Sequence, residues 1–256
     1  MIGSQSLFEG NRIFSSEELA ASLCQCLADY SEHTGSGFDR DVFDVCQRRL
    51  MSFVWSRGYL RAKLEQPRIV ITGQGLVITV RVDEGMLYRL GEIKIEGAEA
   101  LSPDEVKARL GMQEGDVPNG ERIAKWLCED LKSMYGEMGF IQYTAEPTLT
   151  FKSNPRNAKE GIVDFVIYIE EGKRFTFRSL TLIGDTLSEK ELRDSFLLRE
   201  GDIYNQRLFE ESIKKLNDSG RFEALDKDRD AVFRTDEEEG TVEIVIKLQK
   251  RAITPG

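Results

Sequence analysis

The sequence has few of the residues that catalytic and metal sites most often require. It contains one histidine, His33, and four cysteines, which are Cys24, Cys26, Cys46 and Cys128. The cysteine spacing matches no zinc-binding pattern. A lone histidine near the end of an expected helix indicates a solvated position, because no second titratable group accompanies it. We therefore expect no catalytic residue, no metal site and no cofactor.

Excess positive charge and long apolar runs are also missing. The net charge is −10, which argues against a nucleic-acid partner. No apolar run reaches the roughly 18 residues of a membrane-spanning helix. The opening residues MIGSQSLFEG lack the basic and apolar segments of a secretory signal peptide. Since the strand at 4–8 is short beside its counterpart at 88–95, the simplest interpretation is a fragment of a longer precursor, exported or not.

The cysteines leave an alternative open. All four fit small residues of an apolar core. In an oxidising compartment, Cys46 on one expected helix could instead pair with Cys24 or Cys26 on the preceding one. The sequence does not choose between these interpretations, nor between the two pairings.

What the sequence does contain is a repeat. Glycines that end helical runs lie 81 residues apart, at Gly58, Gly139 and Gly220. Glycines that follow an expected strand lie 87 residues apart, at Gly10, Gly97 and Gly184. Self-similarity at a fixed period decides the fold before other signals. We expect three copies of one small domain, at 1–86 (with a truncated first strand), 87–172 and 173–250, and a tail or linker at 251–256.

The second copy shows the order of elements most clearly. A strand is expected at 88–95, and Ser102, Pro103 and Glu105 form a capping box with proline at the first helical position. Asn119 caps a second helix that ends near Gly139. Strands are expected at 140–151 and 162–170. The fold class is α+β: three tandem β-α-α-β-β domains, each a three-stranded mixed sheet with two helices on one face.

The other copies repeat this order with their own caps. Ser16 and Asp39 are expected to cap the helices of the first copy, and Ser188 and Asn205 those of the third. Trp55 and Trp126, both on second helices, are interpreted as core residues.

Prolines identify the strand at the edge of each sheet. Pro67 and Pro147 fall in the second strand of copies one and two. Proline cannot donate a ladder hydrogen bond and is confined to edges and bulges. The second strand is therefore expected at an edge, with backbone groups that another chain can pair with.

These motifs resemble POTRA domains. The features that carry the resemblance are a Gly-Asp-x-x-Asn turn, a glycine followed by an aromatic residue, and a Glu-Gly strand end: Gly115-Asp116/Asn119, Gly201-Asp202/Asn205, Gly58-Tyr59, Gly139-Phe140, Glu84-Gly85 and Glu171-Gly172. The first copy keeps only Gly37-Phe38-Asp39 at the turn. The third has an extra residue in Gly220-Arg221-Phe222 and an acidic stretch, Asp226 to Asp230, where its edge strand is expected.

The resemblance implies the periplasmic arm of a BamA-like outer-membrane protein. Such an arm is expected to be monomeric and non-enzymatic, to dock accessory lipoproteins, and to meet a membrane only through a barrel absent from this chain. Its partners would be unfolded outer-membrane proteins or passenger peptides that add to an edge strand. We expect client contacts at Leu60, Ala62, Leu64, Ile141, Tyr143 and Ala145, and inter-domain hinges at Gly85, Leu87, Tyr88, Gly172, Arg174 and Phe175.

Two other functions stay open from the sequence. One is the arm of a secretion transporter that recognises a dedicated passenger, a family that usually has two such domains. The other is a cell-envelope scaffold. The sequence fixes neither the total number of repeats in the parent protein, nor the clients, nor the accessory partners.

Overall fold

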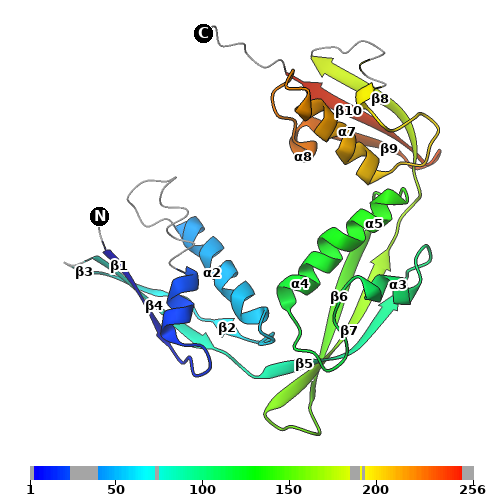
Figure 1. Ribbon diagram of the computed structural model, residues 1–256. Coiled ribbons are helices and arrows are strands. Elements are labelled where there is room, and N and C mark those ends of the chain that lie inside the picture. Colours follow the sequence, from blue (N-terminus) through cyan, green and yellow to red (C-terminus); the bar gives the residue numbers. More distant parts are fainter. Residues whose placement is uncertain (1–2, 24–39, 73–74, 185–190, 192–193, 250–256) are drawn as a thin grey trace. The chain divides into compact units, whose positions relative to one another are not determined.

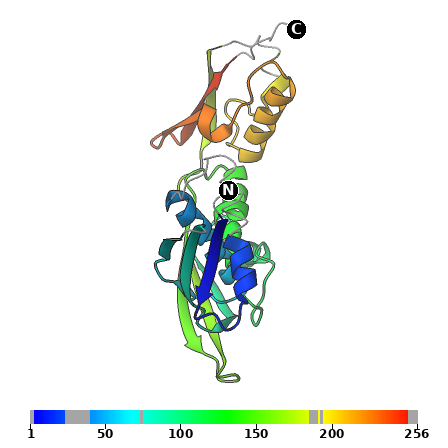
Figure 2. The same cartoon turned by 90° about the vertical axis from the view of Figure 1, so that its left-hand side faces the viewer.

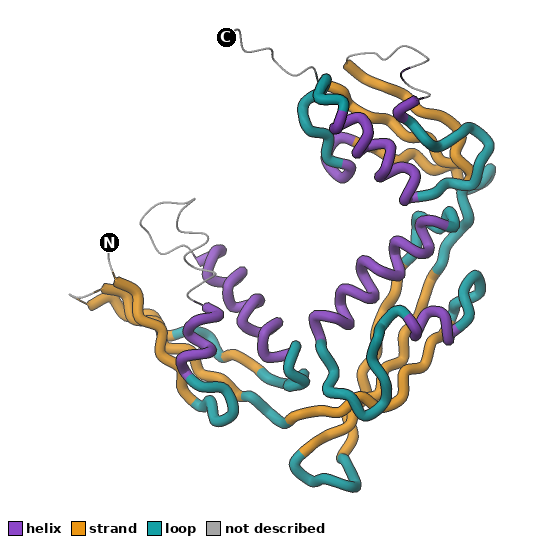
Figure 3. Tube along the Cα trace, in the orientation of Figure 1, coloured by secondary structure: helices purple, strands orange, loops and turns teal. Residues whose placement is uncertain are grey.

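The computed structural model describes residues 3–23, 40–72, 75–184, 191 and 194–249 (Figure 1). The described strands form three sheets, each with one central strand that pairs with both neighbours. Helices cover one face of each sheet, as the tube in Figure 3 and the turned view in Figure 2 show. The expected α+β fold with three mixed sheets is confirmed.

The first sheet is built around β4. It contains β1 (Gly3–Glu9), β2 (Lys63–Leu64), β3 (Arg68–Thr72) and β4 (Gly75–Asp83). β1 runs parallel to β4 and pairs along its whole length, from Gly3 to Glu9, so the short first strand still completes the sheet. β2 and β3 both pair antiparallel with β4. The helical residues 16–23 and helix α2 (Arg40–Trp55) accompany this sheet.

The middle sheet has the order β5-β7-β6. Its strands are β5 (Leu87–Glu96), β6 (Thr144–Ser153) and β7 (Glu160–Glu170). Its helices are α3 (Pro103–Ala108), α4 (Gly120–Lys125), the π-helical turn η1 (Trp126–Asp130) and α5 (Leu131–Glu137).

The third sheet follows the same plan, with the order β8-β10-β9. β8 (Thr176–Gly184) runs parallel to β10 (Thr241–Leu248), and β9 (Ala231–Asp236) runs antiparallel to it. Its described helices are α7 (Gln206–Asp218) and α8 (Lys227–Asp230).

Most local helix signals are confirmed, and one is displaced. Ser102 accepts the amide of Glu105 in a complete capping box with proline at the start of α3, and the Asn119 and Asn205 side chains cap α4 and α7. In the first repeat the cap is Ser15 rather than Ser16, because Ser15 Oγ accepts the amide of Glu18 at 3.1 Å. Its own amide donates to Glu18 at 2.9 Å. The other two expected caps, Asp39 and Ser188, lie outside the described residues.

The tryptophans have different environments. Trp126 is 1% exposed and belongs to a core, as expected. Trp55 is 41% exposed, so its interpretation as a core residue was wrong. Trp55 is the last residue of α2, and at that position it borders the next repeat rather than the core of its own.

The first core also contains a disulfide. Cys46 is fully buried among the apolar side chains of the first repeat and is disulfide-bonded. Cys128 is free and exposed, and the two expected partners of Cys46, Cys24 and Cys26, lie outside the described residues. The disulfide alternative therefore holds over the free-thiol one for Cys46.

By contact density the chain divides into two compact units. One contains 1–94, 110–126 and 147–166, and the other contains 95–109, 127–146 and 167–256. Each unit holds one outer repeat with part of the middle one. Within the described residues, no helix combines the length and the apolar character needed to cross a membrane.

Candidate binding edges and joints between repeats

The second strand of each repeat lies at the edge of its sheet. Pro147 sits inside β6, an outer strand of the middle sheet. Pro67 lies in the break between β2 and β3, where the pairing with β4 is interrupted. Both positions avoid the loss of a ladder hydrogen bond. The edge assignment made from the prolines is confirmed.

β6 is the most open of these edges. Eight of its ten side chains are exposed, and the other two are half-buried. A long edge strand presents a row of backbone N–H and C=O groups to which an extended segment can pair. The arrangement is suited to strand addition, in which main-chain hydrogen bonds dominate.

The third repeat has an edge strand that the sequence did not indicate. The stretch expected to replace it folds mostly as the short helix α8, capped by Asp226 through the amides of Asp228 and Arg229. β9 follows directly and pairs with β10. Val232 and Phe233 of β9 are partly exposed, at 45% and 38%. The four charged residues of α8, Lys227–Asp230, come before β9, so β9 starts farther from Gly220 than β6 starts from Gly139.

The six residues predicted to contact clients form three pairs spaced like the glycines, 81 residues apart: Leu60 and Ile141, Ala62 and Tyr143, Leu64 and Ala145. Only the last pair lies in edge strands, β2 and β6. The other four precede these strands, so their placement on a strand was wrong. The cause is a turn after the second helix, in which Phe140 donates its amide to Tyr135 at 2.9 Å.

One pair belongs to the cores. Ala62 is 5% exposed within the first core, and Tyr143 is 7% exposed. The Tyr143 hydroxyl donates to the carbonyl of Leu127 at 3.2 Å, and its ring stacks on Tyr135 at 4.7 Å. Burial raises the pKa of Tyr143 above its ordinary value. A client could reach these side chains only if the repeat opened.

Another pair faces the neighbouring repeat. Leu60 Cδ2 lies 3.4 Å from the position that a Cβ on Gly120 would occupy. Ile141 packs against the core of the third repeat. These two residues therefore contribute to contacts between successive repeats, which we call joints.

The first joint is a close approach at Gly58. This glycine ends the second helix of the first repeat with φ +85°, and its carbonyl accepts the amide of Tyr88 at 3.0 Å. A Cβ at this position would lie 2.6 Å from Val117 Cγ1 and 2.9 Å from Leu87 Cδ1. Both the backbone conformation and the crowding require glycine here.

The second joint repeats this geometry at Gly139. Its φ is +94°, and its carbonyl accepts the amide of Phe175 at 2.9 Å. A Cβ would lie 2.8 Å from Ile203 Cγ2. Ile203 follows Val117 by 86 residues, the spacing of the two Asn caps. The equivalent glycine of the third repeat, Gly220, is exposed and has no atom near its Cβ position.

The residues expected to act as hinges all lie at or beside these joints. Leu87 and Tyr88 contact Gly58, and Phe175 bonds to Gly139. Arg174 Nε donates to the carbonyl of Met138 at 2.9 Å. The remaining two, Gly85 and Gly172, adopt positive φ angles of 64° and 69° in the short segments that lead into β5 and β8. Motion at these joints stays a prediction.

Two glutamates explain the Glu-Gly motif, whose role the sequence did not reveal. The Glu84 carboxylate is 5% exposed and accepts three backbone amides, from Arg12, Ile13 and Phe14, at 2.8–2.9 Å. Glu171 accepts the amides of Glu99 and Ala100, which lie 87 residues after Arg12 and Ile13. Each glutamate ties the loop after the first strand to the end of the last strand.

An ion pair supports the start of β5. Arg89 donates to both carboxylate oxygens of Glu160, each at 3.1 Å. The hydrogen bond to Arg89 lowers the pKa of Glu160 from its ordinary value. The same bond raises the pKa of Arg89. Because both side chains keep contact with solvent, this half-buried pair contributes little to stability.

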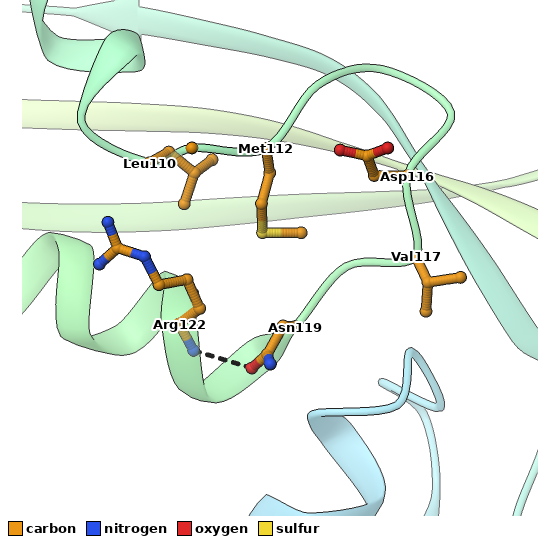
Figure 4. Close-up of a pocket in the computed structure, with 7 residues that line it drawn as sticks. Leu110, Met112, Asp116, Val117, Asn119 and Arg122 are labelled. Carbon is orange, nitrogen blue, oxygen red and sulfur yellow. Dashed lines mark hydrogen bonds between the residues drawn. The ribbon is translucent and has the colours of Figure 1, made fainter.

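Figure 4 shows a shallow hollow of about 520 Å³ beside the start of α4, lined by Leu110, Gly111, Met112, Asp116, Val117, Asn119 and Arg122. Its polar groups are already engaged: Asn119 Oδ1 accepts the amide of Arg122 at 2.9 Å, and Asp116 accepts the amide of Gln113 at 2.8 Å. Across the described parts of the chain, no group of three or more His, Cys, Asp or Glu side chains is placed to bind a metal ion.

A family model gives the repeats a name. The POTRA model, described as "Surface antigen variable number repeat", matches residues 88–172 and 175–251. This chain belongs to the POTRA family. The matched ranges are the second and third POTRA repeats, and the first departs from the motifs as its sequence indicated. The expectation of a non-enzymatic chain agrees with the family.

The relatives that the chain matches over most of its length are distant in sequence. The chain is 24% identical over 253 residues, 96% of its length, to a Treponema pallidum (strain Nichols) protein whose name refers to outer membrane protein assembly. It is 24% identical over 231 residues, 86% of its length, to "Outer membrane protein assembly factor BamA" of Neisseria meningitidis serogroup B (strain ATCC BAA-335 / MC58). The chain spans 29% and 28% of these two proteins, less than a third of their length.

A solved structure shares the fold of the three POTRA repeats. The crystal structure of Haemophilus influenzae BamA POTRA3-5 aligns with a TM-score of 0.73 at 22% identity, over 97% of this chain and 96% of that one. At this identity the likeness shows a common fold. It extends over the first repeat, which the family model does not reach.

Proposed function

We propose that this chain is the periplasmic arm of a BamA-like assembly factor of the outer membrane. In this role it captures unfolded outer-membrane proteins by pairing with the open edge of β6, and it docks accessory envelope subunits. Three observations support the proposal: membership of the POTRA family, relatives named as outer-membrane assembly factors, and a disulfide at Cys46. Disulfides persist in oxidising compartments such as the periplasm.

The observation that carries client capture is the edge strand β6. It offers ten residues with no neighbour on its outer side among the described strands. Of the six predicted client residues, Ala145 lies in this strand and Leu64 in the shorter edge strand β2. Capture through the backbone imposes little sequence selection, as a protein with many clients requires.

Pro147 indicates which backbone groups of β6 face outward. Because proline has no N–H, it is tolerated where the backbone points away from the ladder. Backbone direction alternates along a strand. The groups of Ala145, Leu149 and Phe151 therefore point outward with those of Pro147, and the groups of Thr148 point toward β7.

This alternation gives a sharp test. Leu149→Pro removes one outward N–H without removing a ladder bond, whereas Leu149→Ala keeps the N–H and changes only an exposed side chain. The probe is a synthetic ten-residue peptide of alternating apolar and polar residues, the pattern of a transmembrane β-strand. Its binding is followed through the amide chemical shifts of 144–153 in the full chain.

We expect Leu149→Pro to weaken peptide binding at least tenfold and Leu149→Ala to change it less than threefold. Thermal unfolding should stay near that of the original chain for both variants. Equal binding by the proline variant and the original chain would show that the β6 edge is not the site. Selective loss with Leu149→Ala would indicate side-chain recognition of a dedicated passenger, as in a secretion transporter.

A further inference from the structure

Each joint contains a second close contact, between a glycine and a larger residue. In the first joint the glycine belongs to the later repeat, and in the second joint it belongs to the earlier repeat. Trp55 and Gly136 are equivalent positions at the ends of the second helices, 81 residues apart. Gly120 and Gln206 are equivalent positions after the Asn caps, 86 residues apart. The first joint brings Trp55 against Gly120, and the second brings Gly136 against Gln206.

The separations at these contacts are tighter than ordinary Cβ contacts, so a Cβ added at either glycine would have to displace its neighbour. In the first joint, a Cβ on Gly120 would lie 3.1 Å from Trp55 Cβ. In the second, a Cβ on Gly136 would lie 3.0 Å from Gln206 Cβ and 2.3 Å from its Oε1. Neither glycine has a positive φ, so backbone conformation does not explain either of them. The close contact across the joint therefore favours glycine at one of the two positions.

We propose that this reciprocal glycine determines which repeats can dock in succession. A helix end carrying Trp55 accepts a following repeat whose second helix starts with Gly120, and it excludes one whose second helix starts with Gln206. A helix end carrying Gly136 has room for Gln206. The two joints are therefore not interchangeable: the third repeat fits behind the second and is excluded from a place behind the first. The proposal is independent of client capture.

Each joint has its own reporter. The amide of Tyr88 donates across the first joint to Gly58, and the amide of Phe175 donates across the second to Gly139. Opening of a joint exposes the corresponding amide to solvent, so hydrogen exchange at these two positions follows the joints separately in the full chain.

The experiment gives each joint the pair of residues found at the other joint. Gly120→Gln places two bulky residues at the first joint and should speed exchange at Tyr88 at least tenfold, with Phe175 unchanged. The double variant Trp55→Gly/Gly120→Gln copies the second joint and should restore slow exchange. Gly136→Trp should likewise speed exchange at Phe175 alone, and Gly136→Trp/Gln206→Gly should reverse that effect.

Exchange at the central-strand amides of Val80, Val163 and Ile244 shows whether the repeats remain folded. If Gly120→Gln unfolds a repeat, Gly120→Ala adds only the single Cβ and should speed exchange at Tyr88 at least threefold in the folded protein. The proposal is overturned if the single variants leave their joint amides protected. It is also overturned if the double variants fold and fail to restore protection.

Discussion

Gly139 serves two purposes that separate mutations can distinguish. Its positive φ is shared with Gly220 at the equivalent position, but only Gly139 has neighbours within reach of a Cβ. The left-handed conformation costs an L-residue roughly 1–2 kcal/mol. We therefore expect Gly220→Ala to lower the free energy of unfolding of its repeat by about 1 kcal/mol, as measured by urea denaturation. Gly139→Ala should pay a similar conformational cost and also displace Ile203.

The difference between these variants should appear in hydrogen exchange. Gly139→Ala is expected to speed exchange at the Phe175 amide, because the added methyl group pushes Ile203 and the strand start away from the helix end. Gly220→Ala should leave that amide protected. Equal protection of Phe175 in both variants would mean that the joint tolerates the methyl group and that only the backbone conformation requires glycine.

Residues with local roles could be predicted from the sequence, whereas residues with distant partners could not. Asn119 and Pro147 act on backbone groups of their own segment, and both interpretations held. Glu84 was visible as part of a motif, but its partners lie 70–72 residues earlier in the chain. Gly120 and Gly136 appear ordinary until the distance across each joint is known. Aligning the copies with offsets of 81 and 86 residues would have shown that Trp55 stands at the position of Gly136, and Gln206 at the position of Gly120.

At the scale of elements, the loop after the first strand depends on one carboxylate. Glu84 holds the amides of Arg12, Ile13 and Phe14, and Phe14 is part of the core. Removal of an acceptor leaves buried donors without a partner, at about 1–3 kcal/mol for a fully buried group. We expect Glu84→Ala to destabilise the first repeat by about 2–3 kcal/mol and to speed hydrogen exchange at Ile13 and Phe14.

Two controls accompany this prediction. Glu84→Gln keeps one acceptor oxygen of similar size and should lose about half as much stability. Glu171→Ala removes the equivalent residue, which serves two amides rather than three, and should destabilise the middle repeat less. If Glu84→Gln were as stable as the original chain, the Glu-Gly motif would be explained by the packing of the side chain and not by the hydrogen bonds that its carboxylate accepts from backbone amides.

Element boundaries were predicted less well than element types. The turn after Gly139 has the alternating apolar pattern of a strand, yet Phe140 and Tyr143 are engaged with Tyr135 in the core. A pattern of alternation cannot distinguish a buried turn from the strand that follows it. As a result, strand β6 begins at Thr144, four residues later than expected.

At the scale of the whole molecule, the disulfide makes the first repeat chemically different from the other two. Cys46 is disulfide-bonded, and Cys128 in the middle repeat is free. A loop of the length between Cys46 and Cys24 or Cys26 corresponds to about 3 kcal/mol of stabilisation in the chain-entropy account. Reduction should lower the free energy of unfolding of the first repeat by about 2–4 kcal/mol and leave the second and third repeats unchanged.

The two tryptophans allow the repeats to be followed separately, since Trp55 lies in the first repeat and Trp126 in the second. Urea unfolding of Trp126→Phe, followed by fluorescence, reports the first repeat and should shift on reduction. Trp55→Phe reports the second and should not shift. A thiol count on the denatured, unreduced chain should give two reactive cysteines of the four. The same thiol count is then made on Cys24→Ser and on Cys26→Ser. The variant in which the count falls to one has lost the unpaired cysteine, and the cysteine that it retains is the partner of Cys46. Four reactive thiols in protein purified from an oxidising compartment would contradict both the disulfide and its support for a periplasmic location.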